Sequence, residues 1–168
     1  TSVWNSMDGQ SWFAATTNAA WTARTEHVCV VFSNKLWVMG GMVLASSRAT
    51  NDIWSSSDGA SWTLVTNSAP WTNRYSHAGV VFNGRIWILG GYASGGGTND
   101  VWSSPDGADW TLVTGAAPWS VRYDHAAVVY DGRMWVLGGR SGVSAKPTND
   151  VWYSTDGANW SLATNVAG

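Results

Sequence analysis

Charge is scarce in this sequence. Asp, Glu, Lys and Arg make up 12% of the 168 residues, and the net charge is −2. That share is about half of the usual one. Without an excess of basic residues the chain has no electrostatic footprint for nucleic acid, so no nucleic-acid partner is expected. The one cysteine, Cys29, cannot form an intrachain disulfide. Cysteine usage therefore does not decide the compartment, although an extracellular one is favoured.

Long apolar runs and helical periodicity are also missing. No run approaches the roughly 20 apolar residues that a spanning helix needs, so no membrane span is expected. No segment shows the spacing of an amphipathic helix, which favours an all-β fold. No signal peptide is visible and the first residue is Thr1, so we expect a mature product, a designed chain or a fragment.

The chain contains instead a repeat with a period near 50 residues. His27, His77 and His125 mark this period, at separations of 50 and 48 residues. Residues 50–91 and 98–139 align without a gap and match at 29 of 42 positions. The copies differ in length only after a Gly-Gly pair, in segments of 9, 7 and 9 residues (42–50, 92–98 and 140–148). A fixed period of this length predicts a repeat architecture.

Each copy holds four short apolar runs of strand length, separated by turn residues. In the middle copy these strands, named a to d, are expected at about His77–Phe82, Arg85–Leu89, Asn99–Ser103 and Trp110–Thr114. Dipeptides typical of tight hairpins join a to b and c to d (Asn83-Gly84, Asp131-Gly132, Asp58-Gly59, Asp106-Gly107, Asp156-Gly157). The pattern predicts four antiparallel strands per repeat.

Several features recur at fixed spacing in three copies. They are Arg-x-x-His before strand a, Gly-Gly after strand b, and two spaced tryptophans near strands c and d. Together they resemble the kelch repeat over nearly the whole chain. The segment from Ser56 to Trp62 also resembles a shortened sialidase Asp-box, which is likewise a turn between propeller strands. The resemblance implies an all-β fold, a β-propeller of four-stranded antiparallel kelch-like blades.

The repeat divides the chain into three full blades plus an N-terminal half blade. The half blade (1–16) matches strands c and d, and the full blades span about 24–66, 74–114 and 122–164 of one propeller segment, 1–168. Propellers close with about 4–8 blades, so this number does not make an ordinary ring. An open ring would expose apolar sheet faces. We expect that copies of the chain assemble, or that the remainder of a longer propeller chain completes the ring.

Residues that recur in every blade are expected to be structural. They comprise the arginines and histidines before strand a and the glycine pairs (Arg24, His27, Arg74, His77, Arg122, His125, Gly40, Gly41, Gly90, Gly91, Gly138 and Gly139). Asp52, Asp100 and Asp150 are candidates to pair with the arginines, because a buried charge needs a partner. The histidines are expected to form hydrogen bonds across a blade edge. No metal site is expected, because no Cys or acidic residue repeats beside them at ligand spacing.

The 14 tryptophans also follow the repeat, so we expect most of them to pack between blades. The linker tryptophans Trp21, Trp71 and Trp119 are less certain to be buried, because linkers reach the surface. Cys29 occupies the slot that Gly79 and Ala127 hold in the other blades, which predicts a buried thiol.

Residues that differ between blades are the candidates for ligand binding. They lie just before the histidines and in the b–c loops, which emerge on the same face in kelch-like propellers, and that face commonly binds the partner. The candidates are Thr25, Glu26, Arg48, Tyr75, Ser76, Tyr92, Tyr123, Asp124, Arg140 and Lys146.

These observations predict a non-catalytic scaffold or a module that binds a protein or peptide, without a cofactor. No Ser-His-Asp order, phosphate loop or isolated carboxylate pair is present. Nothing matches the copper site of galactose oxidase or the arginine triad of sialidases. The alternative is a carbohydrate-binding, lectin-like propeller, which requires exposed linker tryptophans to bind a glycan. An enzyme fragment is less favoured.

Overall fold

A computed structural model describes residues 1–142 and 145–166 of the chain. Within these residues the chain forms strands and turns and no helix, which confirms the predicted all-β class. Residues 143–144 of the expected b–c loop and 167–168 of the expected propeller segment lie outside the described residues.

Three four-stranded antiparallel units follow an N-terminal hairpin of β1 (Val3–Asn5) and β2 (Phe13–Thr16). We call these units the first, second and third blade. Strands a are β4 (Val28–Phe32), β9 (Ala78–Phe82) and β14 (Ala126–Tyr130). Strands b are β5 (Lys35–Val43), β10 (Arg85–Ala93) and β15 (Arg133–Ser141). Strands c are β6 (Arg48–Ser56), β11 (Gly96–Ser104) and β16 (Lys146–Ser154), and strands d are β7 (Thr63–Thr66), β12 (Thr111–Thr114) and β17 (Ser161–Thr164).

Three two-residue strands precede strands a, and the sequence pattern did not predict them. They are β3 (Arg24–Thr25), β8 (Arg74–Tyr75) and β13 (Arg122–Tyr123). Each pairs with the end of strand b in its own blade, and β8 and β13 also pair with strand c of the preceding blade. The bridging strands thereby make one continuous sheet of 15 strands from the three blades.

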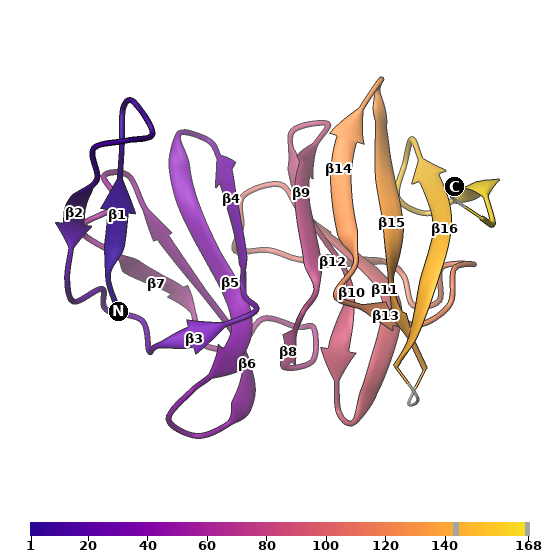
Figure 1. Cartoon of the computed structure of the whole chain (residues 1–168), viewed down its shortest axis with the longest axis horizontal. Coiled ribbons are helices and arrows are strands. Elements are labelled where there is room, and N and C mark those ends of the chain that lie inside the picture. Colours follow the sequence, from indigo (N-terminus) through magenta and orange to yellow (C-terminus); the bar gives the residue numbers. More distant parts are fainter. Residues whose placement is uncertain (143–144, 167–168) are drawn as a thin grey trace.

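The blades stand side by side, with the chain termini at opposite ends of the row (Figure 1). Strand β9 contacts both β4 and β14, so the strands a of neighbouring blades lie next to one another. Strands d lie at the other edge of each blade, because each pairs only with its own strand c. Strands a are therefore the ones through which neighbouring blades meet edge by edge.

Apolar side chains between successive blades form the core. One cluster joins Met39 and Ile53 of the first blade to Ile86 and Ile88 of the second. A second cluster joins the second and third blades in the same way, and a smaller one joins the N-terminal hairpin to the first blade. Each blade therefore depends on its neighbours for burial, as in other repeat proteins.

The turns between strands c and d carry a repeated hydrogen-bond network. In the first blade, the Asp58 carboxylate accepts backbone N–H bonds from Ala60 and Ser61 at 2.8 and 2.7 Å. The Ser56 hydroxyl donates to Asp58 and accepts from the Gly59 N–H. Hydrogen bonds to the ionised form lower the pKa of Asp58 to about 2. The same contacts form in the N-terminal hairpin around Asp8, so that hairpin has the turn of a complete blade.

The sequence pattern predicted that strand b ends before the Gly-Gly pair. In the structure, strand b continues through the pair. Strand β10 continues to Ala93 and β11 begins at Gly96, so most of the expected loop 92–98 belongs to the sheet. The pairing register shifts between Leu89 and Gly91, which makes the glycine pair a β-bulge. Glycine tolerates the positive φ angles that this bulge requires (53° and 109° in the second blade).

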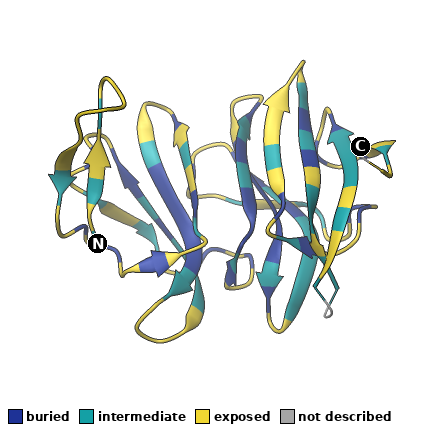
Figure 2. Ribbon diagram, in the orientation of Figure 1, coloured by how far each residue is buried: buried dark blue, intermediate teal, exposed yellow. Residues whose placement is uncertain are grey.

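In the part of the chain that the structure describes, no blade follows the third one, and only the N-terminal hairpin packs on the outer side of the first. In the third blade, Val128 and Tyr130 are 47% and 72% exposed, whereas their counterparts Val80 and Phe82 in the second blade are both 7% exposed. Figure 2 shows this contrast between β14 and β9.

The prediction that Cys29 is buried is wrong, because the residue is exposed, with its side chain lining a pocket rather than the core. The second blade shows what is missing there: Gly79, in the equivalent slot, packs against Val28 of the preceding strand a. The N-terminal hairpin has no strand a, so nothing equivalent covers Cys29.

Replacement of Gly90 by Val should strongly destabilise the fold. A Cβ at this position would lie 2.9 Å from the Thr98 carbonyl oxygen and 3.1 Å from that of Arg122, at a φ of 53°. We expect a loss of about 3 kcal/mol or more in the free energy of unfolding, measured by urea denaturation. Gly96→Val is the matched control, because Gly96 has no positive φ and no atom within 4 Å of its Cβ position. Equal stability of the two variants would contradict the bulge assignment.

Candidate functional site

A buried ion pair anchors each blade below the face that carries the candidate residues. Arg74 is bound to Asp100 through two hydrogen bonds of 2.8 and 2.7 Å, and it also donates to the Gly90 carbonyl oxygen at 2.8 Å. Arg24 with Asp52 and Arg122 with Asp150 repeat this arrangement. The guanidinium side chains are fully buried. The structure thereby supplies the Arg–Asp partners that the sequence left open.

The carboxyl groups of the aspartates in these pairs have pKa values below the ordinary one, so they stay ionised at lower pH. Burial alone would raise the pKa of Asp100, but the hydrogen bonds and charge of Arg74, together with the Trp102 indole N–H, lower it. The same balance lowers the pKa of Asp52 and of Asp150. An ion pair whose remaining lone pairs are also satisfied can be buried without a large net penalty.

The histidines fill the gap between the glycine pairs of adjacent blades. A Cβ on Gly40 of the first blade would lie 2.9 Å from His77 Cε1, and one on Gly91 would lie 2.6 Å from His77 Cβ. Both ring nitrogens of His77 and of His125 are buried and, within the described residues, have no partner in hydrogen-bond geometry. Each ring nonetheless interacts with the backbone of strand b in the preceding blade, His77 with Met39 and His125 with Leu89, and this contact raises the pKa against the larger effect of burial. The histidines act as packing groups that require glycine on both sides.

The candidate residues next to the histidines form a chain of contacts across the blades. The Ser76 N–H donates to the Glu26 carbonyl oxygen, and the Asp124 N–H donates to that of Ser76, both at 3.0 Å. The Ser76 hydroxyl also donates to the Glu26 carboxylate. All three residues have positive φ, between 52° and 57°. Glu26, Ser76 and Asp124 thus come from three blades but form one row.

Three tyrosines lie together beside this row. Tyr75 and Tyr92 are paired across β8 and β10, with ring centroids 5.1 Å apart. Tyr92 meets Tyr123 of the next blade edge to face, also at 5.1 Å. Burial raises the pKa of Tyr75, and the neighbouring tyrosines, Glu26 and Asp124 raise it further. This cluster is an aromatic surface in a negatively charged environment. We use the name loop face for the three tyrosines together with the row of Glu26, Ser76 and Asp124.

The remaining candidates lie at the margin of the loop face. Arg140 pairs with Tyr123 in the sheet and contacts the Asp124 carboxylate at 3.5 Å, with both side chains about half exposed. Thr25 pairs with Met42 at the corresponding position of the first blade. Arg48 and Lys146 begin strands c and are exposed, and no contact ties them to the tyrosines in the described part of the chain.

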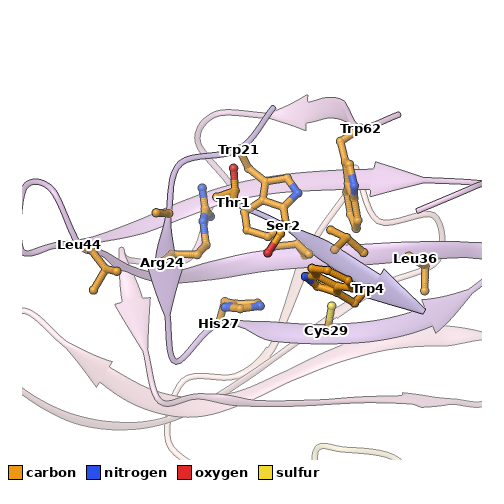
Figure 3. Close-up of a pocket in the computed structure, with 13 residues that line it drawn as sticks. Thr1, Ser2, Trp4, Trp21, Arg24, His27, Cys29, Leu36, Leu44 and Trp62 are labelled. Atoms are coloured by element: carbon orange, nitrogen blue, oxygen red, sulfur yellow. The ribbon is translucent and has the colours of Figure 1, made fainter. Parts of the chain in front are cut away.

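A pocket of about 540 Å³ lies between the N-terminal hairpin and the first blade (Figure 3). His27, Cys29 and Leu36 of the first blade line it, together with Trp4 and Ser2 of the N-terminal hairpin. Partial burial raises the pKa of the Cys29 thiol, which disfavours the reactive thiolate. Inner strands of the neighbouring blade fill the corresponding space in the second and third blades. The pocket is therefore explained by the missing inner strands of the N-terminal hairpin.

The linker tryptophans are not available as a sugar-binding surface. Trp71 and Trp119 are each 1% exposed, and Trp21 is 8% exposed. Each packs edge to face on the tryptophan that directly precedes a strand d (Trp62, Trp110, Trp160). The lectin alternative required these rings to be exposed, so it loses the feature on which it depended.

The described residues contain neither a metal-binding cluster nor a membrane-spanning helix. In residues 1–142 and 145–166, no three His, Cys, Asp or Glu side chains are grouped so that they could hold a metal ion. Over the same residues, no helix has the length and apolar character needed to cross a membrane.

Comparison with known proteins identifies the class of the chain. The KLHDC2/KLHL20/DRC7 Kelch-repeats domain matches residues 1–165. The chain therefore belongs to the kelch-repeat family, which confirms the β-propeller fold that the resemblance implied. Kelch propellers are protein-interaction modules. A search of curated proteins gave no match.

The buried histidines predict a loss of stability in mild acid. Burial, with a contribution from the nearby arginines, lowers the pKa of His77 to about 3 and that of His125 to about 4, from an ordinary value of 6.5. At a pH between the folded-state pKa and 6.5, the histidines of the unfolded chain bind protons that those of the folded chain do not. The free energy of unfolding should therefore fall as the pH is lowered from 6.5 towards 4. Below that range, protonation of Asp52, Asp100 and Asp150 should add to the loss.

Urea denaturation at a series of pH values measures this effect. The slope between pH 6.5 and 4 should correspond to roughly two protons taken up on unfolding by His77 and His125, with a further contribution from His27, whose pKa burial also lowers. In a His125→Gln variant the slope should decrease by about one proton. A flat profile across this range would contradict the buried, neutral state of the histidines.

Proposed function

We propose that the chain is a non-catalytic scaffold that binds a protein or peptide through the loop face. The observation that carries this proposal is the tyrosine cluster of Tyr75, Tyr92 and Tyr123, which three different segments bring together. The first blade has Thr25 and Met42 at the positions of Tyr75 and Tyr92, so the cluster is not required by the repeat. Partly exposed tyrosines combine a large apolar surface with a hydroxyl group, which suits protein recognition.

The charges around the tyrosines favour a partner with a basic side chain. Glu26 and Asp124 flank the cluster, and Arg140 contacts Asp124. A lysine or arginine placed on a tyrosine ring near a carboxylate gains both cation–π and charge interactions. The proposed ligand is therefore a peptide segment with a basic residue next to an apolar one.

The proposal includes completion of the ring by further blades. Val128 and Tyr130 at one end, and Val31 and Cys29 at the other, are exposed although their counterparts face a neighbouring blade. Exposed apolar area of this kind marks an association surface. Copies of the chain or a longer propeller chain would both cover it.

Selection from a random peptide library tests the binding face. The purified chain should enrich peptides that contain a basic and an apolar residue, and Tyr92→Ala should weaken binding of a selected peptide at least tenfold. Leu112→Ala is the control, because Leu112 is 47% exposed on strand d of the second blade, away from both the loop face and the open ends. Thermal melting checks that both variants are folded. Unchanged affinity of the Tyr92→Ala variant would overturn the proposed face.

A further inference from the structure

Successive blades are joined by an indole packed on a glycine. The six-membered ring of Trp37 in the first blade lies over Gly107 in the c–d turn of the second, where a Cβ would come within 2.2 Å of it. Trp87 of the second blade lies over Gly157 of the third in the same way, at 2.1 Å. Any side chain at these glycines would displace the indole. The contact therefore requires a glycine in the c–d turn of the blade that packs on this tryptophan.

One tryptophan of this kind has no glycine partner in the described residues. Trp135 of the third blade donates its indole N–H to the Tyr130 carbonyl oxygen at 3.0 Å. The corresponding bonds of Trp37 and Trp87 are 3.0 and 2.9 Å, so the three indoles are held in the same way. Trp135 lies in a pocket of about 340 Å³ that it forms with Val128, Tyr130, Leu137 and Val151.

Two glycines of this kind, Gly59 and Gly9, have no indole partner in the same residues. Gly59 of the first blade meets Leu36, Ala15 and Val3 instead, because the N-terminal hairpin has no strand b to supply a tryptophan. Gly9 lies in the c–d turn of the N-terminal hairpin, with a φ of 75° and nothing within 4 Å of its Cβ position. The hydrogen bonds around Asp8 hold this turn in the conformation of the complete blades. On the same hairpin, Trp4 and Trp12 are 53% and 58% exposed.

The partner of Trp4 can be deduced from the complete blades. Trp102, its counterpart in the second blade, packs against the cluster that contains Met39 and Ile53 of the first blade. Trp152 of the third blade packs against the cluster that contains Leu89 and Val101. The equivalent positions in the third blade are Leu137 and Val151, which line the pocket around Trp135.

We propose that the N-terminal hairpin of a second copy docks on the third blade, with Trp135 packed on Gly9 and Trp4 packed on Leu137 and Val151. The second copy is the occupant because it carries a preformed hairpin with the required glycine and indole. Two copies joined head to tail would supply eight blade positions, within the range of about 4–8 for closed propellers. This inference rests on the proposal that further blades complete the ring and is independent of the loop face.

The docked hairpin covers only the outer part of the third blade. Val128 and Tyr130 lie on β14, the innermost strand, and the hairpin consists of strands that correspond to c and d. A small interface of this kind is expected to be weak and to dissociate on dilution, with a dissociation constant in the micromolar range.

Light scattering over a dilution series tests the joint. Concentrated protein should have the mass of two copies of 18.0 kDa each, and Gly9→Asn and Leu137→Lys should each shift it to one copy. The matched controls are Gly84→Asn, at a turn glycine that is also open and has a φ of 66°, and Leu112→Lys, at a leucine that is 47% exposed on an outer strand. Both controls should keep the mass of the unmodified chain.

Three outcomes would overturn the proposal. They are a mass of one copy at every concentration, an assembly that Gly9→Asn and Leu137→Lys leave intact, and an assembly that the controls disrupt equally. The first outcome would favour completion of the ring within a longer chain. Peptide binding by the loop face, measured on the same samples, separates failure of this joint from failure of the proposed function.

Discussion

The buried arginine of each blade is the interaction on which the other features depend. The Arg74 side chain, fully buried, needs the Asp100 carboxylate and the Gly90 carbonyl oxygen as acceptors. It thereby ties the segment before strand a to strand c and to the bulge of strand b. Removal of either acceptor would leave the buried guanidinium without one of its hydrogen-bond partners, which would strongly destabilise the fold. The pair also fixes the start of β8, which carries Tyr75 to the loop face.

The glycine pairs convert this arrangement within a blade into contact between blades. Their bulge directs the Gly90 carbonyl oxygen to the arginine, and the absence of a side chain leaves room for the histidines of two neighbouring blades. His77 and His125 pack there in the neutral form, which links the stability of the propeller to pH. The regularly spaced histidines, which could suggest a metal site in the sequence, are thus explained by packing between blades.

Function is expected where the repeat is broken. The loop face differs from blade to blade, and its tyrosines meet because the bridging strands bring the ends of strands b close to the segments before the histidines. The open ends are the second departure from the repeat. There, residues that are buried between complete blades remain exposed, as Trp135 and Gly9 illustrate.

The sequence by itself determined the period, the order of four strands per blade, the hairpin turns and the family, because turn dipeptides and strand patterns are local signals. It also identified Arg74, His77 and Gly90 as structural. Only the tertiary structure decided that Arg74 binds Asp100, that the glycine pair is a bulge within a longer strand, and that Cys29 is exposed. It alone brought Tyr92 and Tyr123 together. Each of these facts depends on contacts between segments distant in sequence, or on the absence of a neighbouring strand, and neither leaves a local pattern.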